Sequence, residues 1–225
     1  MPLQSRVSPF GELFATPARG TLLGNRGGRL HDSHQKLTPR RWVNRAWICC
    51  KLEFNDRHRK VWGNSYTELF FLDEVTAFAA GHRPCFECRR KDAERFALLF
   101  SGKKRRASAT AMDKVLHAER LDGKAKRGHR ARLDPLPDGA MISLEGQAFA
   151  VQGNRLLRWT PEGYSESRSR PKGITIDVLT PPSILAVLRR GYAPLWHPSA
   201  TRWIARIAPD QSADIRNMRK AGRKS

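Results

Sequence analysis

Two cysteines separated by two residues carry the clearest chemical signal. Cys85 and Cys88 lie in the stretch GHRPCFECRR, between a proline and the start of an expected helix. A Cys-x-x-Cys turn places both sulfur atoms on one side of a tight loop, as tetrahedral zinc requires. Neighbouring arginines favour the thiolate form, which also suits redox chemistry. A thioredoxin-like site would follow a strand, whereas a helix and a loop precede this pair; inert thiols are the third interpretation.

A zinc site needs further ligands, and the other two cysteines are adjacent. Cys49 and Cys50 fall on an expected strand, where neighbouring side chains point to opposite faces. An ordinary strand therefore offers only one of them, although a bulge could offer both. The pattern does not choose between the two. A histidine is then a candidate for the remaining ligand, and His58 and His82 are the nearest in sequence.

The stretch FFLDEVTAFAAGHRPCFECRR resembles the second half of the zinc-binding domain of the Ada DNA-repair proteins. The resemblance is strong over about 20 residues, looser over 42–100, and rests on Phe70, Phe71, Ala80, Gly81, His82, Arg83, Pro84, Cys85, Cys88 and Arg89. It implies a zinc site and an association with DNA repair. In that family one of two separated upstream cysteines accepts a methyl group from a DNA phosphotriester. Adjacent cysteines replace them here, so methyl transfer is not implied.

The overall charge points to a polyanionic partner. The chain has 42 Lys and Arg against 21 Asp and Glu, a net charge of +21. Such a field favours nucleic acid, since binding releases counterions from phosphates. We expect DNA before RNA and no membrane, because a membrane surface normally requires an amphipathic anchor or a lipid signal. The candidate phosphate contacts are Arg83, Arg89, Arg90, Lys91, Lys103, Lys104, Arg105, Arg106, Lys124, Lys126 and Arg127.

A second group of candidate residues lies in the stretch TAMDKVLHAERL. Asp113, His117 and Arg120 share one face of an expected helix, and Glu119 lies near its apolar stripe. An Asp beside a His raises the pKa of the imidazole, which suits general acid–base catalysis. Ordinary surface ion pairs explain the pattern equally. An enzyme acting on nucleic acid, as a nuclease or by alkyl transfer from a zinc thiolate, is thus one alternative function; a structural part of an RNA–protein assembly is another.

The expected fold class is α+β, a zinc-knuckle module followed by a small antiparallel β domain. The expected segments are a partly ordered basic arm (1–40), the zinc-binding module (41–122), a basic linker (123–137), a β-rich domain (138–207) and a basic tail (208–225). The absence of an apolar leader or membrane-length apolar run leads us to expect a cytoplasmic protein, with nucleoid association possible in principle.

Local patterns predict the individual elements. A hairpin is expected to pair 45–54 with 57–63, followed by a strand at 66–71. Helices are expected over 74–80, capped by Asp73 and ended by Gly81, over 89–100, ended by Gly102, and from a Thr110–Asp113 capping box to about 121. The stretches AMISLEG, QAFAVQG, RLLRWTPEGY and ITIDVLT are expected strands, and PPSILAVLRRG a helix.

Overall fold

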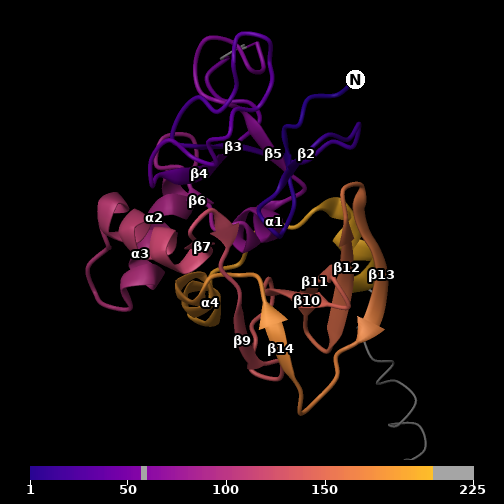
Figure 1. Cartoon of the computed structure of the whole chain (residues 1–225). Coiled ribbons are helices and arrows are strands. Elements are labelled where there is room, and N and C mark those ends of the chain that lie inside the picture. Colours follow the sequence, from indigo (N-terminus) through magenta and orange to yellow (C-terminus); the bar gives the residue numbers. More distant parts are fainter. Residues whose placement is uncertain (57–59, 205–225) are drawn as a thin grey trace, which may run out of the picture.

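The computed structural model describes residues 1–56 and 60–204, in which two six-stranded sheets and several short helices form an α+β fold. The expected α+β class is therefore confirmed. The first sheet lies at the top of Figure 1 and the second at the bottom, with α1 (Glu74–Ala79) between them. The predicted tail, 208–225, lies outside the described residues. No helix in the described ranges has the length and apolar character needed to cross a bilayer.

The first sheet uses residues that were expected to form an N-terminal arm. Its strand order is β2-β1-β5-β3-β4-β6, and β3 pairs with β5 on one side and β4 on the other. Residues 1–40 thus supply the edge strand β2 and the interior strands β1 and β3, so more of the expected, partly ordered basic arm belongs to the fold than the sequence indicated. The strands are β1 (Arg6–Val7), β2 (Leu13–Phe14), β3 (Leu22–Arg26), β4 (Trp47–Cys50), β5 (Leu69–Phe71) and β6 (Arg83–Pro84).

The hairpin predicted for 45–54 and 57–63 does not form. Strand β4 pairs antiparallel with β3 and parallel with β6, so both of its edges are occupied by distant segments. Residues 57–59 lie outside the described residues, and 61–66 form turns and bends. Long-range pairing of two apolar strands has prevailed over a local turn signal. The strand predicted at 66–71 is confirmed in its second half as β5.

Local capping signals predicted the helices more accurately. The Asp73 carboxylate accepts a hydrogen bond from the Thr76 amide at 2.8 Å at the start of α1, and Gly81 follows with φ +81°. Gly102 ends α2 (Arg90–Ser101) in the left-handed conformation. Helix α3 (Ala109–Arg120) is capped by Ser108, so the predicted Thr110–Asp113 box is wrong.

The second sheet has the strand order β13-β12-β11-β10-β14-β9. Its strands β10 to β13 form a meander in which each antiparallel partner follows the last after a short turn. The sequence predicted β10, β11 and β12, whereas β13 was not predicted. The segment predicted as a linker, 123–137, supplies β9, which pairs with β14. The strands are β9 (His129–Arg132), β10 (Met141–Leu144), β11 (Gln147–Gln152), β12 (Arg155–Thr160), β13 (Gly163–Ser169) and β14 (Thr175–Val178).

Five further elements complete the described chain. Strands β7 (Leu121–Asp122) and β8 (Ala125–Lys126) form a short hairpin directly after α3. Helix α4 (Pro182–Arg189) begins with proline, as expected, and packs against α2 and α3. A 3-10 turn (Pro198–Ala200) leads into α5 (Thr201–Ile204).

Helix α1 packs in hydrophobic clusters with both sheets. Leu72, just before α1, and Val75, within α1, pack in one cluster with Met141 and Tyr164 of the second sheet. A second cluster joins residues of α1, α2 and α3 to α4: Phe78, Phe96, Ala97, Met112, Leu116, Ile184, Val187, Leu188 and Tyr192. The segments predicted as two domains are thus packed as one body, with no free linker between them.

Two consecutive acids reinforce this junction. Asp73 accepts hydrogen bonds from the Tyr164 hydroxyl at 2.8 Å and the His197 amide at 3.0 Å. Glu74 accepts from the Tyr192 hydroxyl at 3.0 Å and the Leu195 amide at 2.9 Å. Both carboxylates are fully buried. The start of α1 is therefore the polar joint between the N-terminal and C-terminal halves.

Candidate metal centre and basic surface

Three thiols converge where β4, β6 and α2 meet. The sulfur atoms of Cys50, Cys85 and Cys88 all lie within 4.8 Å of one another, a group that could hold a metal ion. Cys50 ends β4, Cys85 follows β6, and Cys88 lies just before α2. Thiolate sulfurs at such spacing are suitable ligands for a tetrahedral metal.

Strand pairing explains why these cysteines meet. Strands β4 and β6 are parallel, with Cys49 opposite Pro84, so one more residue along each strand brings Cys50 beside Cys85. The Cys85 amide donates to the Cys49 carbonyl at 3.0 Å, which extends this pairing. The following turn is tight, because the Glu87 amide donates to the Cys85 sulfur at 3.4 Å. That turn carries Cys88 back toward the strand.

Cys49 lies on the opposite face of the sheet. Its sulfur is fully buried and accepts a hydrogen bond from Arg89 Nη1 at 3.3 Å. Burial raises the pKa of this thiol, which keeps it protonated. The expectation that β4 offers only one cysteine to the metal is therefore confirmed in favour of Cys50, and Cys49 is removed from the candidate ligands.

The three clustered thiols share protons among themselves. Hydrogen bonds, first from Cys50 and then from Cys88, lower the pKa of Cys85. The pKa of Cys50 is raised, first because it donates to Cys85 and next because it donates to Cys88. A bound cation would favour the thiolate form of all three sulfurs and displace the protons that they hold.

A pocket of about 240 Å³ opens beside the cluster. The sheet face that carries Cys50 forms one wall through alternate residues of β3, β4 and β5, and the loop after β4 contributes Leu52, Phe54, Val61 and Tyr66. Glu68 also lines this pocket and is 3% exposed. Its Oε2 accepts from the Trp62 amide at 2.8 Å, whereas Oε1 is buried without a hydrogen-bond partner.

Of the two predicted histidines, only His82 falls within the described residues, and it does not lie at the cluster. His58 lies outside the described residues. His82 is fully buried on the face that carries Cys49, with its ring 5.0 Å from that of Trp47 and 4.7 Å from that of Phe71. It therefore packs away from the three sulfurs, and no histidine joins them within the described residues.

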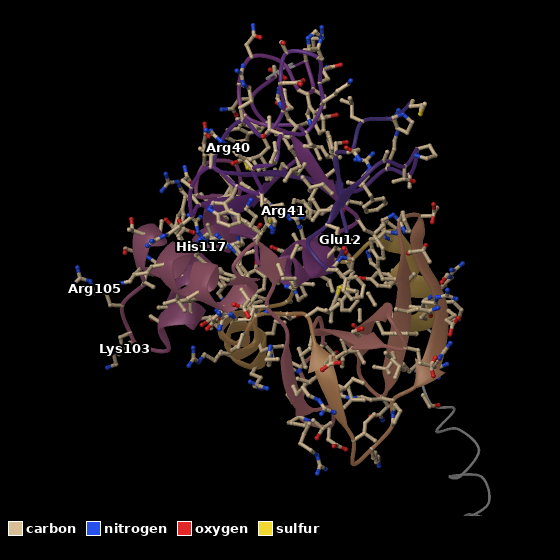
Figure 2. The ribbon with its side chains drawn as sticks, in the orientation of Figure 1. Glu12, Arg40, Arg41, Lys103, Arg105 and His117 are labelled. Carbon is tan, nitrogen blue, oxygen red and sulfur yellow. The ribbon has the colours of Figure 1, made fainter. Side chains whose placement is uncertain are left out.

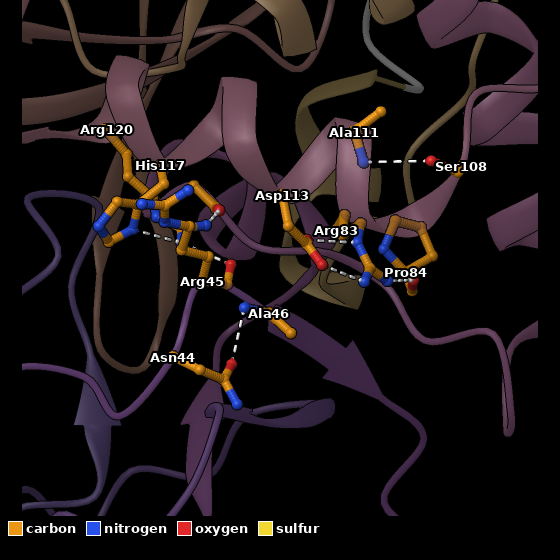
Figure 3. A network of polar contacts seen from close by, with 11 residues as sticks. Asn44, Arg45, Ala46, Arg83, Pro84, Ser108, Ala111, Asp113, His117 and Arg120 are labelled. Carbon is orange, nitrogen blue, oxygen red and sulfur yellow. Dashed lines mark hydrogen bonds and ion pairs between the residues drawn. The ribbon is translucent and has the colours of Figure 1, made fainter.

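The acids proposed for catalysis on α3 are committed to other partners. Asp113 accepts two hydrogen bonds from Arg83, at 2.7 and 2.8 Å, in the paired geometry seen in Figure 3. Glu119 accepts from the amide of Ser183 at 2.9 Å and from its hydroxyl at 2.6 Å. Glu119 thereby caps the first turn of α4, a structural role that no local pattern indicated.

His117 has no carboxylate partner. Its Nδ1 lies 3.1 Å from Arg120 Nη2 (Figure 3). Its ring contacts that of Trp42 edge-on, with the ring centres 5.3 Å apart. Burial, and then the charge of Arg120, lower the pKa of His117, the reverse of the predicted effect of Asp113. The expected group of Asp113, His117 and Glu119 is therefore not assembled.

Three of the predicted phosphate contacts are internal. Arg83 pairs with Asp113, and Arg89 forms an ion pair with Glu74 at 2.7 Å, both with almost no exposure. Lys126 is partly buried and its ammonium group donates to the Ala79 carbonyl. These cations are used inside the fold, which corrects their assignment as surface contacts.

The other predicted basic residues are exposed. Arg90 and Arg106 pair with Glu94, and Arg127 pairs with Asp122 at 3.5 Å. The remaining cations, Lys91, Lys103, Lys104, Arg105 and Lys124, are exposed without an ion pair among the described residues. Figure 2 shows Lys103 and Arg105 pointing outward from the loop between α2 and α3.

A basic hollow was missed by the sequence analysis. It has a volume of about 550 Å³ and is lined by Pro39, Arg40, Arg41, Trp42, Val43 and Lys124. Arg40, Arg41 and Lys124 are exposed, and Trp42 is half-buried. The segment 39–43 and Lys124, more than 80 positions later, form this surface together. The cluster RRW at 40–42 was therefore the only local signal for it. We call it the Trp42 hollow.

Comparison with known proteins adds no relative. A scan against protein-family models, a search of curated proteins and a search of solved structures each gave no match.

Proposed function

We propose that this protein is a zinc-stabilised nucleic-acid-binding protein that acts on DNA, in the context of DNA repair. The observation that supports it best is the Trp42 hollow, which three exposed cations line together with the half-buried Trp42. Arginine and lysine contact phosphates, and a partly exposed tryptophan stacks on an unpaired base. The net charge of +21 supports the same partner.

Zinc would be held by Cys50, Cys85 and Cys88. Three thiolates leave one position of a tetrahedral ion for a further ligand. The metal would connect the ends of β4 and β6 to the start of α2. It would thereby hold in place the segment from which Arg83 and Arg89 form their buried ion pairs. The preference for DNA and for repair rests on the local resemblance to the Ada zinc-binding domain.

An enzyme is the second candidate, for one specific reason. The pocket beside Cys50 contains Glu68, a buried carboxylate with one unpartnered oxygen. A metal with an open position beside a carboxylate is the arrangement used for metal-assisted hydrolysis. This alternative predicts that Glu68→Gln abolishes turnover of a nucleic-acid substrate while binding persists.

The decisive test is DNA binding by the purified chain, measured by fluorescence anisotropy across a salt series. If about six phosphates are contacted on duplex DNA, log affinity falls against log salt with a slope of about −5. The double charge reversal Arg40→Glu with Lys124→Glu should reduce affinity at least tenfold. Lys172→Glu with Arg130→Glu, on the second sheet, is the matched control.

Two results would contradict the proposal. One is an affinity that does not depend on salt; the other is an equal loss in the control, which would indicate net charge alone. Elemental mass spectrometry of untagged, reduced protein tests the metal separately. About one zinc per chain is expected for three thiolate ligands, and protein free of metal would remove that part of the proposal.

A further inference from the structure

A cluster of buried cations lies on the other face of the first sheet, away from the three thiols. Arg26 and Arg120 are each 1% exposed, and their guanidinium carbons lie 4.2 and 3.9 Å from the centre of the Trp47 ring. Lys126 adds a third positive charge beside them. Like charges confined this closely repel strongly unless an anion joins them.

The polar atoms of this cluster are incompletely paired. Arg26 Nη2 donates to the Gly11 carbonyl, and Arg120 donates to the carbonyls of Gly81 and Arg45. Arg26 Nε, Arg120 Nε and Trp47 Nε1 are buried without any hydrogen-bond partner. Three buried N–H donors in one place cost free energy unless an acceptor meets them.

No acid within the described residues neutralises the cluster. Asp113 is the carboxylate whose charge reaches Arg120, but both of its oxygens already accept from Arg83. Burial, and then the charge of Arg41, lower the pKa of Arg26 to about 9, and burial, and then the charge of Arg26, lower that of Arg120 to about 9. Burial, and then Arg26 and Arg120, lower the pKa of Lys126 to about 7. The surroundings of the cluster therefore disfavour its positive charges.

A narrow gap leads from the surface to these donors. It is lined by Phe10, Gly11, Arg26, Arg41, Trp47, Arg120, Leu121 and Lys126, and its free volume is about 10 Å³, the space of one water molecule. Arg41 is exposed and also lines the Trp42 hollow. Arg41 thus connects the surface hollow to the buried cluster, and an outward turn of its side chain would widen the gap.

We propose that the pocket formed by Arg26, Arg41, Trp47, Arg120 and Lys126 binds a terminal phosphate group. A phosphate monoester carries up to two negative charges and several acceptor oxygens, which match the unpaired donors. The narrow entrance favours a chain end over a phosphodiester inside a strand. Phosphate binding at this site does not depend on the function proposed above. The further claim, that the phosphate belongs to the end of a nucleic acid lying in the Trp42 hollow, rests on that function.

Two titrations at pH 6.5 test the site and the source of the phosphate. Inorganic phosphate is titrated by calorimetry at constant ionic strength, with sodium chloride as the balancing salt. A labelled single-stranded oligonucleotide is then compared with and without a 5′-phosphate by anisotropy. Arg41→Ala is the main variant because Arg41 is exposed, and Lys126→Met is the second. Lys172→Ala, on an exposed turn of the second sheet, is the control of equal charge.

The wild type and Lys172→Ala should bind phosphate and prefer the phosphorylated oligonucleotide about tenfold, the value of one charge-assisted hydrogen bond. Arg41→Ala and Lys126→Met should lose that preference while keeping their thermal unfolding transition. Phosphate binding without an oligonucleotide preference would support the site but overturn the nucleic acid as its source. If the titration with phosphate releases no more heat than the titration with chloride, the proposed phosphate site is wrong. A water molecule would then be the occupant of the gap between the cations. Oligonucleotide binding would survive that result, so the two proposals fail separately.

Discussion

Cys49 and Cys50 are consecutive residues of β4, yet their sulfur atoms lie on opposite faces of the first sheet. Cys50 joins Cys85 and Cys88, whereas Cys49 accepts a hydrogen bond from Arg89. Strand geometry alone produces this separation, because successive side chains alternate between the two faces. One residue of register therefore decides which thiol is available to a metal.

Serine substitutions at these two positions should have different effects on metal binding. Cys50→Ser removes a ligand, so zinc affinity should fall by more than the ~10–100-fold that loss of an outer-shell partner costs. Cys49→Ser should leave the zinc content unchanged. Competition against a chromophoric chelator measures both variants. Equal losses in the two would show that neither sulfur acts as a specific ligand.

The buried ion pair of Arg89 and Glu74 should be costly to break from one side. Arg89→Met leaves the Glu74 carboxylate buried without its 2.7 Å partner, which should lower the free energy of unfolding by about 3–5 kcal/mol. Adding Glu74→Gln should recover part of that loss, because the neutral amide leaves no unpaired charge, its oxygen can accept from the Leu195 amide and its NH2 group can donate to the Tyr192 hydroxyl. Urea unfolding of the two single variants and the double variant measures the coupling. A strictly additive double variant would contradict this account.

Two helix caps of different burial offer a matched comparison. Ser108 caps α3 at an exposed position, so Ser108→Ala should cost about 1 kcal/mol. Asp73 caps α1 and also accepts from Tyr164 and His197 across the junction of the two halves, so Asp73→Ala should cost about 3 kcal/mol or more. Chemical unfolding of both variants is the measurement. Similar costs would mean that the cross-junction hydrogen bonds add little.

Lys126 should make the stability depend on pH in the neutral to alkaline range. Burial, and then Arg26 and Arg120, lower its pKa from 10.5 to about 7 in the folded state. Between these values the unfolded chain binds more protons, so the contribution of Lys126 to the free energy of unfolding rises with pH and is lost as pH falls toward 7. The slope is up to about 1.4 kcal/mol per pH unit.

The wild type minus Lys126→Met difference between pH 7 and 8.5 isolates this contribution, since other groups titrate in both proteins. Lys172→Met, a substitution of an exposed lysine, should show no such slope. A difference that stays constant with pH would show that Lys126 keeps an ordinary pKa in the folded state.

Local signals in the sequence predicted local structure. Asp73 and Gly81 marked the two ends of α1 because a cap and a left-handed residue act within a few positions. The meander of the second sheet followed from turns between neighbouring strands. The alternation of β4 also limited the metal ligands to one of two adjacent cysteines.

Partners far apart in the sequence could not be predicted in the same way. The pairing of β3 with β4, and the use of Glu119 to cap α4, depend on tertiary packing that no local pattern encodes. Arg83 and Arg89 read as surface charges, because only the folded chain shows that Asp113 and Glu74 meet them inside. The Trp42 hollow was missed because it combines two distant segments.

The junction at Asp73 and Glu74 has a consequence for synthesis on the ribosome. Leu195, which donates to Glu74, follows it by 121 residues, or about 6–24 s of translation at ~5–20 residues per second. During this interval the two acids stay hydrated on a nascent chain, while Cys50, Cys85 and Cys88 have all been made. A metal ion is therefore able to bind the three thiols before synthesis is complete, if the proposed site is used, whereas the closure of the whole molecule must wait for its final segment.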